Sequence, residues 1–364
     1  MKIMFDLTLL EEQPTGIPRV AECVAKTFIQ KFPEHSYELV FHKSIPSRFP
    51  IRESTDNITV RVLHSRNKMV RIWDLPRAMK KSDADWILCC AMPGPLPLWD
   101  KRVVSVIHDI TCWKFPETML WKSRMKWRAL IRHAVKTNTH ILNVSETVKR
   151  EVEEKFGNTN ATAICNGVDI TEDEDLRILE KHSLENGRYI LSVATLEPRK
   201  NLKVLLQAFQ KINPDSGMKL VLTGRKGWKL QDAVGQIDEN LVKNIVFTDY
   251  VSDAELNALY NHARVFVSAS VYEGFGLPVI EAVRHNLPVL ISDIPIYREI
   301  TGGKAVYFQC SSAEDLCQKL EICIAEDQRG TEAFAQLRDH AAQYTWENHA
   351  VRLNQLLTQG YVNG

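Results

Sequence analysis

The strongest constraint on the fold of this chain is the alternation of short apolar runs with amphipathic segments of helix length. The apolar runs are Lys2–Phe5, Tyr37–Phe41, Ile58–Leu63, Trp86–Cys90, Val103–His108, His140–Val144, Ala161–Cys165, Tyr189–Ala194, Lys219–Thr223, Ile245–Thr248, Val265–Ser268, Val289–Ser292 and Ala305–Phe308. Helical patterns between them include Val20–Phe32, Trp121–Lys136, Leu202–Ile212 and Asp253–His262. Such alternation predicts an α/β fold with parallel sheets covered by helices on both faces. The runs are too numerous for one sheet, so we expect two doubly wound domains.

An acidic segment at 169–175 and a polar one at 181–187 separate the two groups of runs. Exposed polar stretches of this kind are typical of connections between domains. We therefore predict a first domain at 1–168, a linker at 169–185 and a second domain at 186–345, followed by a separate helix at 346–364. The total length of 364 residues suits two or three domains.

Composition narrows the class of protein. The formal net charge of +1 gives no global field that would attract nucleic acid, so we expect no nucleic-acid partner. The eight cysteines form no C-x-x-C pair, and Cys89 and Cys90 lie in an apolar run, which favours core positions and a reducing compartment. The N-terminus reaches Asp6 too early for a signal peptide, and no apolar run approaches the ~18 residues that span a bilayer. We expect a cytoplasmic protein that is at most peripheral at the inner face of a membrane.

The most informative motif is Glu273-Gly-Phe-Gly-Leu-Pro-Val-Ile-Glu281, which places two carboxylates across a glycine-rich turn that enters a helix. Pro278 suits the first helical turn, and Glu281 is then expected in that same turn, beside free backbone amides. Gly274 and Gly276 let the backbone approach a ligand closely. The turn therefore suits a phosphorylated, hydroxyl-rich ligand, whereas an isolated Gly-x-Gly would indicate only a strand–turn–helix with a capping glutamate.

Two further motifs follow apolar runs in the second half of the chain. Arg199-Lys200 follows one run just before a helix, and two cations at that place could clamp a diphosphate. A solvated surface pair is an equally good interpretation of that stretch alone. Gly224-Arg225 follows the next run and is a weaker signal. Ligands of doubly wound sheets bind beyond the carboxyl ends of strands, so these motifs are candidates for one site.

The first half offers two candidate segments. His108-Asp109 ends an apolar run, where a site residue is favoured over a histidine satisfied within the core. Gly16 and Arg19 lie in a loop that precedes a helix, which is a plausible anion-binding turn. This loop lacks the G-x-G-x-x-G pattern, so a nicotinamide or flavin dehydrogenase is disfavoured.

The segment Trp121–Lys136 is basic and contains no acid. At helical spacing, one face carries Trp127, Leu130, Ile131 and Ala134, and the other carries Lys122, Lys126, Arg132 and Lys136. A basic amphipathic helix of this kind can rest on an anionic bilayer. The alternative is a packed domain helix whose basic face is merely solvated.

Together these motifs resemble the retaining, nucleotide-sugar-dependent glycosyltransferases of family 4, which have the GT-B fold of two facing Rossmann-like domains. The resemblance covers nearly the whole chain and is strongest in Tyr189–Phe308. Its most specific element is the stretch Glu273–Glu281, which is similar to the family's E-x7-E signature in the form E-G-F-G-L-P. The segments Val251–Leu256, Pro288–Asp293 and Tyr344–Trp346 are also similar to those of the family.

The resemblance implies roles for matching residues. His108, Lys200 and Glu273 are the implied catalytic residues, with Arg199 and Lys200 neutralising the diphosphate leaving group without a metal. Donor contacts are implied for Gly16, Arg199, Lys200, Gly224, Arg225, Gly274, Phe275, Gly276, Leu277 and Glu281, and acceptor contacts for Arg19 and Asp109. Glu281 would hold the ribose hydroxyls, and no cofactor is expected besides the nucleotide-sugar donor.

The chain also departs from the family pattern. Thr195 stands where the family often has arginine, and the N-terminal loop has only Gly16 where the family is often glycine-rich. The form Thr15-Gly-Ile-Pro-Arg19 resembles a subgroup of bacterial polysaccharide mannosyltransferases. That points to GDP-mannose, without excluding UDP-sugars, and to a saccharide acceptor carried on polyprenyl diphosphate in surface-polysaccharide or O-antigen synthesis. The alternatives are a nucleotide-sugar 2-epimerase of the same fold and a non-catalytic sugar-binding protein.

Overall fold

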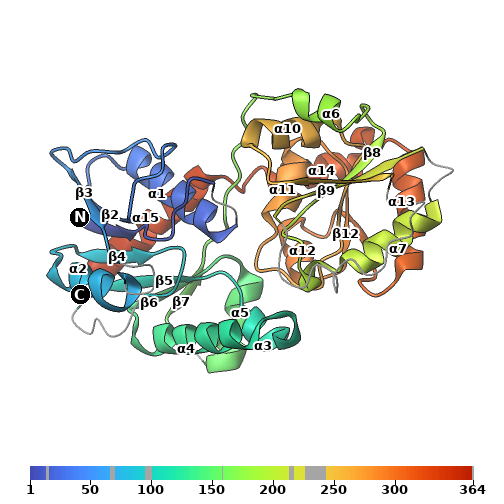
Figure 1. Ribbon diagram of the computed structural model, residues 1–364. Coiled ribbons are helices and arrows are strands. Elements are labelled where there is room, and N and C mark those ends of the chain that lie inside the picture. Colours follow the sequence, from blue (N-terminus) through green and yellow to red (C-terminus); the bar gives the residue numbers. More distant parts are fainter. Residues whose placement is uncertain are drawn as a thin grey trace. The chain divides into compact units, whose positions relative to one another are not determined.

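The computed structural model describes residues 1–13, 16–65, 70–94, 101–157, 159–212, 217–225 and 243–362, with side chains through 359. The chain divides into two compact units, one formed by Met1–Gly167 with Thr345–Gly364 and the other by Val168–Tyr344. Each unit contains a sheet whose strands alternate along the chain with helices (Figure 1).

The first unit is built on a seven-stranded sheet with the order β3-β2-β1-β4-β5-β6-β7, in which every pairing is parallel. Its strands are β1 (Lys2–Asp6), β2 (Ser36–His42), β3 (Ile58–Leu63), β4 (Trp86–Cys89), β5 (Val103–Ile107), β6 (His140–Asn143) and β7 (Ala161–Ala163). Its helices are α1 (Ile17–Lys31), η1 (Val70–Asp74), α2 (Leu75–Lys81), α3 (Thr111–Lys114), η2 (Pro116–Thr118), α4 (Trp121–Thr137), α5 (Glu146–Phe156) and α15 (Trp346–Val362). The order reverses between β1 and β4, which makes their carboxyl ends the topological switch point.

Helix α15 comes from the end of the chain but belongs to the first unit, where it lies beside α1 (Figure 1). His349 Nδ1–H donates to the carbonyl oxygen of Cys165 over 2.9 Å, and Lys31 pairs with Glu347. A Cβ atom at Gly167 would lie 2.1 Å from the backbone nitrogen of Trp346. Glycine at 167 therefore allows the two crossing segments to pass in direct backbone contact.

The second unit repeats the architecture with a six-stranded parallel sheet of order β10-β9-β8-β11-β12-β13. Its strands are β8 (Tyr189–Val193), β9 (Lys219–Thr223), β10 (Ile245–Asp249), β11 (Val265–Ser268), β12 (Val289–Ser292) and β13 (Val306–Phe308). Its helices are α6 (Arg177–Lys181), η3 (Pro198–Lys200), α7 (Leu202–Ile212), α10 (Asp253–His262), α11 (Leu277–Arg284), α12 (Pro295–Ile300), α13 (Ala313–Ala325), η4 (Gln328–Gly330) and α14 (Glu332–Ala341). Here the switch point lies between β8 and β11.

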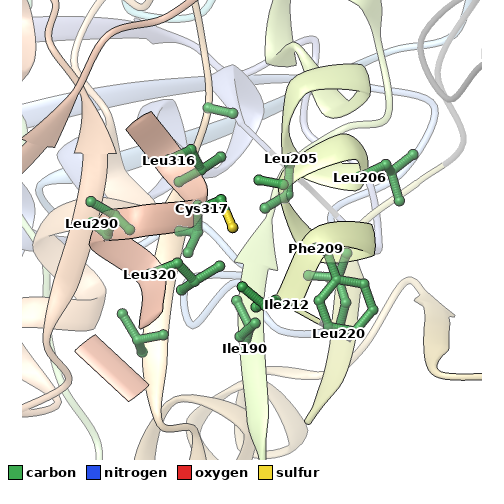
Figure 2. Packing of buried hydrophobic residues seen from close by; sticks show 14 of the residues in the cluster. Ile190, Leu205, Leu206, Phe209, Ile212, Leu220, Leu290, Leu316, Cys317 and Leu320 are labelled. Atoms are coloured by element: carbon green, nitrogen blue, oxygen red, sulfur yellow. The ribbon is translucent and has the colours of Figure 1, made fainter. Parts of the chain in front are cut away.

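A hydrophobic cluster fastens α7 and α13 to the second sheet (Figure 2). Leu205 and Phe209, four positions apart on α7, are fully buried, as are Leu316 and Leu320 on α13. Each such side chain contributes about 1.5–3 kcal/mol when buried. Because α7 is held so firmly, the short turn η3 that leads into it has a fixed place at the end of β8.

The strand predictions are confirmed, with ends that coincide with the predicted ones or differ by at most two residues. The helix expected at Val20–Phe32 is wrong at its start, because α1 begins at Ile17 and Pro18 occupies its first turn. Cys89 and Cys90 are buried, as predicted. The segment 169–185 belongs to the second unit, where the amide of Asn257 on α10 donates to the carbonyl of Asp173 over 2.9 Å.

Candidate active site

The second switch point gathers the charged residues that the sequence motifs singled out. Lys200 Nζ lies 2.5 Å from Glu273 Oε1, and Arg199 Nη1 donates to Glu273 Oε2 over 2.7 Å. The other terminal nitrogen of this guanidinium, Nη2, donates to Glu197 Oε1 over 2.6 Å. Ser270 Oγ donates to Glu273 Oε1 over 2.7 Å. Since η3 follows β8 and Glu273 follows the neighbouring β11, the topology itself brings these side chains together.

Hydrogen bonds to the backbone join the loop that follows β8 to the loop that follows β11. The amide of Val271 donates to the carbonyl of Arg199 over 3.0 Å, and Arg199 Nη1 also donates to the carbonyl of Tyr272 over 2.8 Å. Asn201 ends η3 in the left-handed conformation, with φ 52°. The charged cluster therefore sits on a turn that is fixed on both sides.

Burial and charge act against each other in this cluster. The side chains of Arg199, Lys200 and Glu273 are only 15%, 14% and 12% exposed. Burial alone would raise the pKa of Glu273, but Lys200, Arg199 and the hydrogen bonds lower it to about 2. Burial lowers the pKa of Lys200, and Glu273 opposes that effect. Glu273 is therefore a carboxylate at neutral pH and has no proton to donate as a general acid.

The glycine-rich turn leads into α11, and the amide of Leu277, the first residue of this helix, can face an anion. Gly276 precedes the helix with φ 100°, and a Cβ atom there would lie 2.7 Å from the ring of Tyr297. Phe275 is buried with its ring 5.6 Å from that of Tyr344. The side chain of Phe275, which was predicted to contact the donor, is therefore packed inside the unit. Its backbone is the part of the residue that can contact a ligand.

The expectation that Glu281 lies in the first helical turn is wrong. Helix α11 starts at Leu277, one residue before Pro278, so Glu281 lies in the second turn. Its carboxylate accepts a hydrogen bond from Tyr260 Oη over 2.9 Å.

Gly224 follows β9 and lies against the end of β8. Its φ is 138°, and a Cβ atom would lie 2.2 Å from the carbonyl oxygen of Ala194, so only glycine allows this close approach. The guanidinium of Arg225 lies 5.5 Å from the ring centroid of Tyr250. The structure thus places both predicted donor residues at the carboxyl end of the strand next to β8.

In the first unit, His108 and Asp109 directly follow β5. His108 Nε2–H donates to the carbonyl of Cys90 over 2.7 Å, and burial lowers the pKa of this imidazole. His108 is therefore neutral at pH 7, with its lone pair on Nδ1. Asp109 Oδ1 accepts the backbone N–H of Thr111 over 2.9 Å.

The N-terminal candidates lie at the beginning of α1. Gly16 immediately precedes the helix with φ 57°, and Arg19 lies in its first turn. Thr15 of the same motif is outside the described residues, as is Lys226 beyond Arg225.

Sequence reasoning missed three members of these networks. Glu197 lies two residues before Arg199, and Ser270 lies three residues before Glu273. Their closeness in sequence to predicted site residues was the signal that could have identified them. The sequence gave no indication of Tyr260, because its contact with Glu281 depends on how α10 and α11 lie in the folded unit.

Metal ligands and membrane-spanning helices are both absent from the described part of the chain. There, no group of three or more His, Cys, Asp or Glu side chains is placed to hold a metal ion. Likewise, none of the helices within the described ranges has both the length and the apolarity needed to cross a bilayer.

Comparison with known proteins is consistent with this geometry. A family model described as "Glycosyl transferases group 1" matches residues 175–345, and one described as "Glycosyltransferase Family 4" matches residues 33–172. O-antigen chain mannosyltransferase B of Escherichia coli is 30% identical over 265 residues, which cover 70% of this chain and 69% of the relative. O-antigen chain mannosyltransferase RfbU of Salmonella typhimurium is 28% identical over 263 residues, with 72% and 70% covered.

Solved structures share the fold over almost the whole chain. Anabaena Alr3699/HepE in complex with UDP and glucose superposes with a TM-score of 0.75 at 16% identity, covering 99% of this chain and 100% of that one. WaaG, a glycosyltransferase involved in lipopolysaccharide biosynthesis, gives 0.71 at 16% identity, with 98% and 100% covered. Both the family models and the more similar relatives agree with the two Rossmann-like units, and the chain belongs to the family-4 glycosyltransferases of the GT-B fold.

Proposed function

We propose that this glycosyltransferase moves mannose from GDP-mannose to a saccharide acceptor carried on polyprenyl diphosphate, during assembly of an O-antigen or related surface polysaccharide. The observation that carries the chemistry is the buried cluster of Arg199, Lys200 and Glu273 at the switch point of the second unit. The choice of mannose and of a lipopolysaccharide acceptor is supported by the names of the two O-antigen mannosyltransferases to which the chain is similar.

In the proposed reaction, the bond between the sugar's anomeric carbon and the diphosphate breaks, and negative charge grows on the β-phosphate. Lys200, Arg199 and the amide of Leu277 at the start of α11 stabilise that charge, as fixed donors aimed at a developing anion do in other enzymes. The acceptor hydroxyl attacks on the face that the diphosphate leaves, and the departing phosphate takes its proton, which retains the anomeric configuration.

Glu273 and His108 would act on the donor sugar rather than on the leaving group. Glu273 is ionised, so it accepts hydrogen bonds from sugar hydroxyls and holds the two cations in place. The neutral imidazole of His108 has a lone pair on Nδ1 that can accept a hydrogen bond from a sugar hydroxyl. Neither group is a nucleophile in this scheme.

The decisive experiment compares GDP-mannose with UDP-, dTDP- and ADP-sugars in thermal-shift and turnover assays with a polyprenyl-diphosphate saccharide. A ligand that binds only the folded protein raises its melting temperature. We expect GDP-mannose to do so, and mannosylated lipid to appear together with GDP. A sugar isomer formed from the donor alone would instead indicate an epimerase. Sugar binding without turnover of any donor would indicate a sugar-binding protein.

The lipid-linked acceptor also requires a place where the enzyme meets the membrane, and we assign this to the outer face of α4. On the predicted apolar face, Ile131 and Ala134 are buried, and Trp127 and Leu130 are half-buried. Exposed basic side chains on the opposite face are Lys122, Lys126, Arg132 and Lys136. Among them stand Trp121 and Met125, which are 63% and 51% exposed. Aromatic and apolar groups among cations, with no acid in the helix, match an anionic bilayer surface.

Vesicle co-sedimentation tests this contact without depending on activity. We expect binding to phosphatidylglycerol vesicles at low salt, weaker binding at high salt, and loss of binding on reversing the charges of Lys122, Lys126 and Arg132. Each basic residue near an anionic bilayer contributes about 1 kcal/mol. Charge reversal at Lys80 and Lys81, exposed at the end of α2, is the matched control and should leave binding intact. Binding that survives the α4 reversal would show that another surface makes the contact.

A further inference from the structure

Tyr260 on α10 makes the contact with Glu281 that the sequence did not predict. It is only 1% exposed, and its Oη donates to Glu281 Oε2 over 2.9 Å. Its ring is stacked on His285, with centroids 5.1 Å apart and an interplanar angle of 14°, and it also packs against Phe266 at 6.1 Å. In turn, His285 Nδ1 forms a hydrogen bond with Asn261 Oδ1 over 2.7 Å. The phenol oxygen therefore has a fixed position.

We propose that Tyr260 is a positioning residue that orients the Glu281 carboxylate for the ribose hydroxyls of the donor nucleotide. This inference rests on the proposed function and on the ribose contact that the family resemblance implies for Glu281. The terminal torsion of a glutamate is broad, so a free carboxylate would have to be ordered when the nucleotide binds. A hydrogen bond from a buried, immobile phenol orders it beforehand, and a carboxylate, with about four acceptor positions, can accept several hydrogen bonds at once.

The chain offers a matched control for this role. Tyr189 is also fully buried in the second unit, but its Oη donates over 2.7 Å to the backbone carbonyl of Leu259 and not to a carboxylate. Replacing either tyrosine by phenylalanine removes one buried hydroxyl and one hydrogen bond that involves a residue of α10. Only Tyr260→Phe should also loosen Glu281.

The test measures kcat and KM for GDP-mannose, and calorimetric Kd values for GDP and 2′-deoxy-GDP, in the wild type, Tyr260→Phe, Tyr189→Phe and Glu281→Gln. We expect Tyr260→Phe to raise KM and the Kd of GDP about three- to tenfold, in line with the loss of one hydrogen bond, with kcat changed less than twofold. The wild-type preference for GDP over 2′-deoxy-GDP should shrink by a similar factor. Tyr189→Phe should lower only the melting temperature.

The outcomes separate the inference from the function on which it rests. If Glu281→Gln weakens GDP binding while Tyr260→Phe leaves Kd and the deoxy preference unchanged, positioning by Tyr260 is refuted and the ribose assignment stands. If Glu281→Gln has no effect on GDP binding, the assignment of Glu281 to ribose is wrong, and the role of Tyr260 falls with it. A protein that binds no GDP overturns both. A fall in kcat equal to the fall in kcat/KM would show that Tyr260 acts on the reacting centre instead.

Discussion

Replacing Lys200 by alanine tests the proposed charge stabilisation most directly. The lysine is one of two cations beside Glu273, and the reaction scheme assigns it to the growing charge of the leaving diphosphate. Removing one fixed donor to transition-state charge typically costs about 2.7–4 kcal/mol, or roughly 100- to 1000-fold in turnover. We expect a loss of that size in kcat, measured at saturating donor.

The structure also predicts a cost in stability for Lys200→Ala. If Lys200 lay in an open cleft, its loss would leave folding nearly intact. Its side chain is in fact 14% exposed and paired with the largely buried Glu273. Removing one partner of a fully buried ion pair costs about 3–5 kcal/mol. Because Arg199 and Ser270 still hold Glu273, we expect a smaller loss, about 1–3 kcal/mol in urea unfolding.

A lysine elsewhere in the same unit serves as the control. Lys211 on α7 pairs with Glu314, but both side chains are about half exposed or more, at 49% and 60%. Lys211→Ala should change stability far less than Lys200→Ala and leave kcat unaltered. A fall in kcat of less than threefold for Lys200→Ala, in protein shown to be folded, would mean that the diphosphate lies elsewhere.

Three further outcomes follow from the same site. Glu281→Gln should mainly raise KM for the donor, whereas Glu273→Gln should mainly lower kcat, because ribose does not react and the sugar does; steady-state kinetics in which both affect KM alone would contradict this division. Turnover should persist in EDTA, since Lys200, Arg199 and backbone amides supply the positive charge, and a strict need for Mg²⁺ or Mn²⁺ would refute that part of the scheme. The pKa of Glu273 lies near 2 instead of its ordinary 4.5, so its contribution to stability is complete above pH 4.5 and lost as pH falls toward 2. Denaturant unfolding between pH 2 and 6 should show this acid-side loss in the wild type and a weaker loss in Glu273→Gln.

The strands could be predicted from sequence because parallel strands covered on both faces must be apolar throughout, so that runs such as Leu88–Cys90 need no tertiary context. The charged motifs could be predicted for a related reason, since Lys200 and Glu273 each follow such a run. Their direct pairing could not, because it depends on β8 and β11 being neighbours in the sheet. The contact between Tyr260 and Glu281 had no local signal in the sequence. The position of Glu281 in α11 was predicted wrongly because Pro278 fits more than one position of a first turn, and the helix starts one residue before it.

The charge balance of the cluster suggests why a carboxylate stands where the proposed scheme binds a diphosphate. Burial lowers the pKa of Lys200, and a lysine that lost its proton could not stabilise a leaving diphosphate. Glu273 favours the charged form of that lysine, and Glu197 holds the guanidinium of Arg199 from the other side. Glu273 thus helps to keep Lys200 charged, and the two carboxylates hold both cations fixed in a poorly solvated place before any ligand arrives. Because the cations are already ordered, charge that develops on the phosphate meets donors that need no reorganisation, and this is the condition under which electrostatic stabilisation lowers a barrier most.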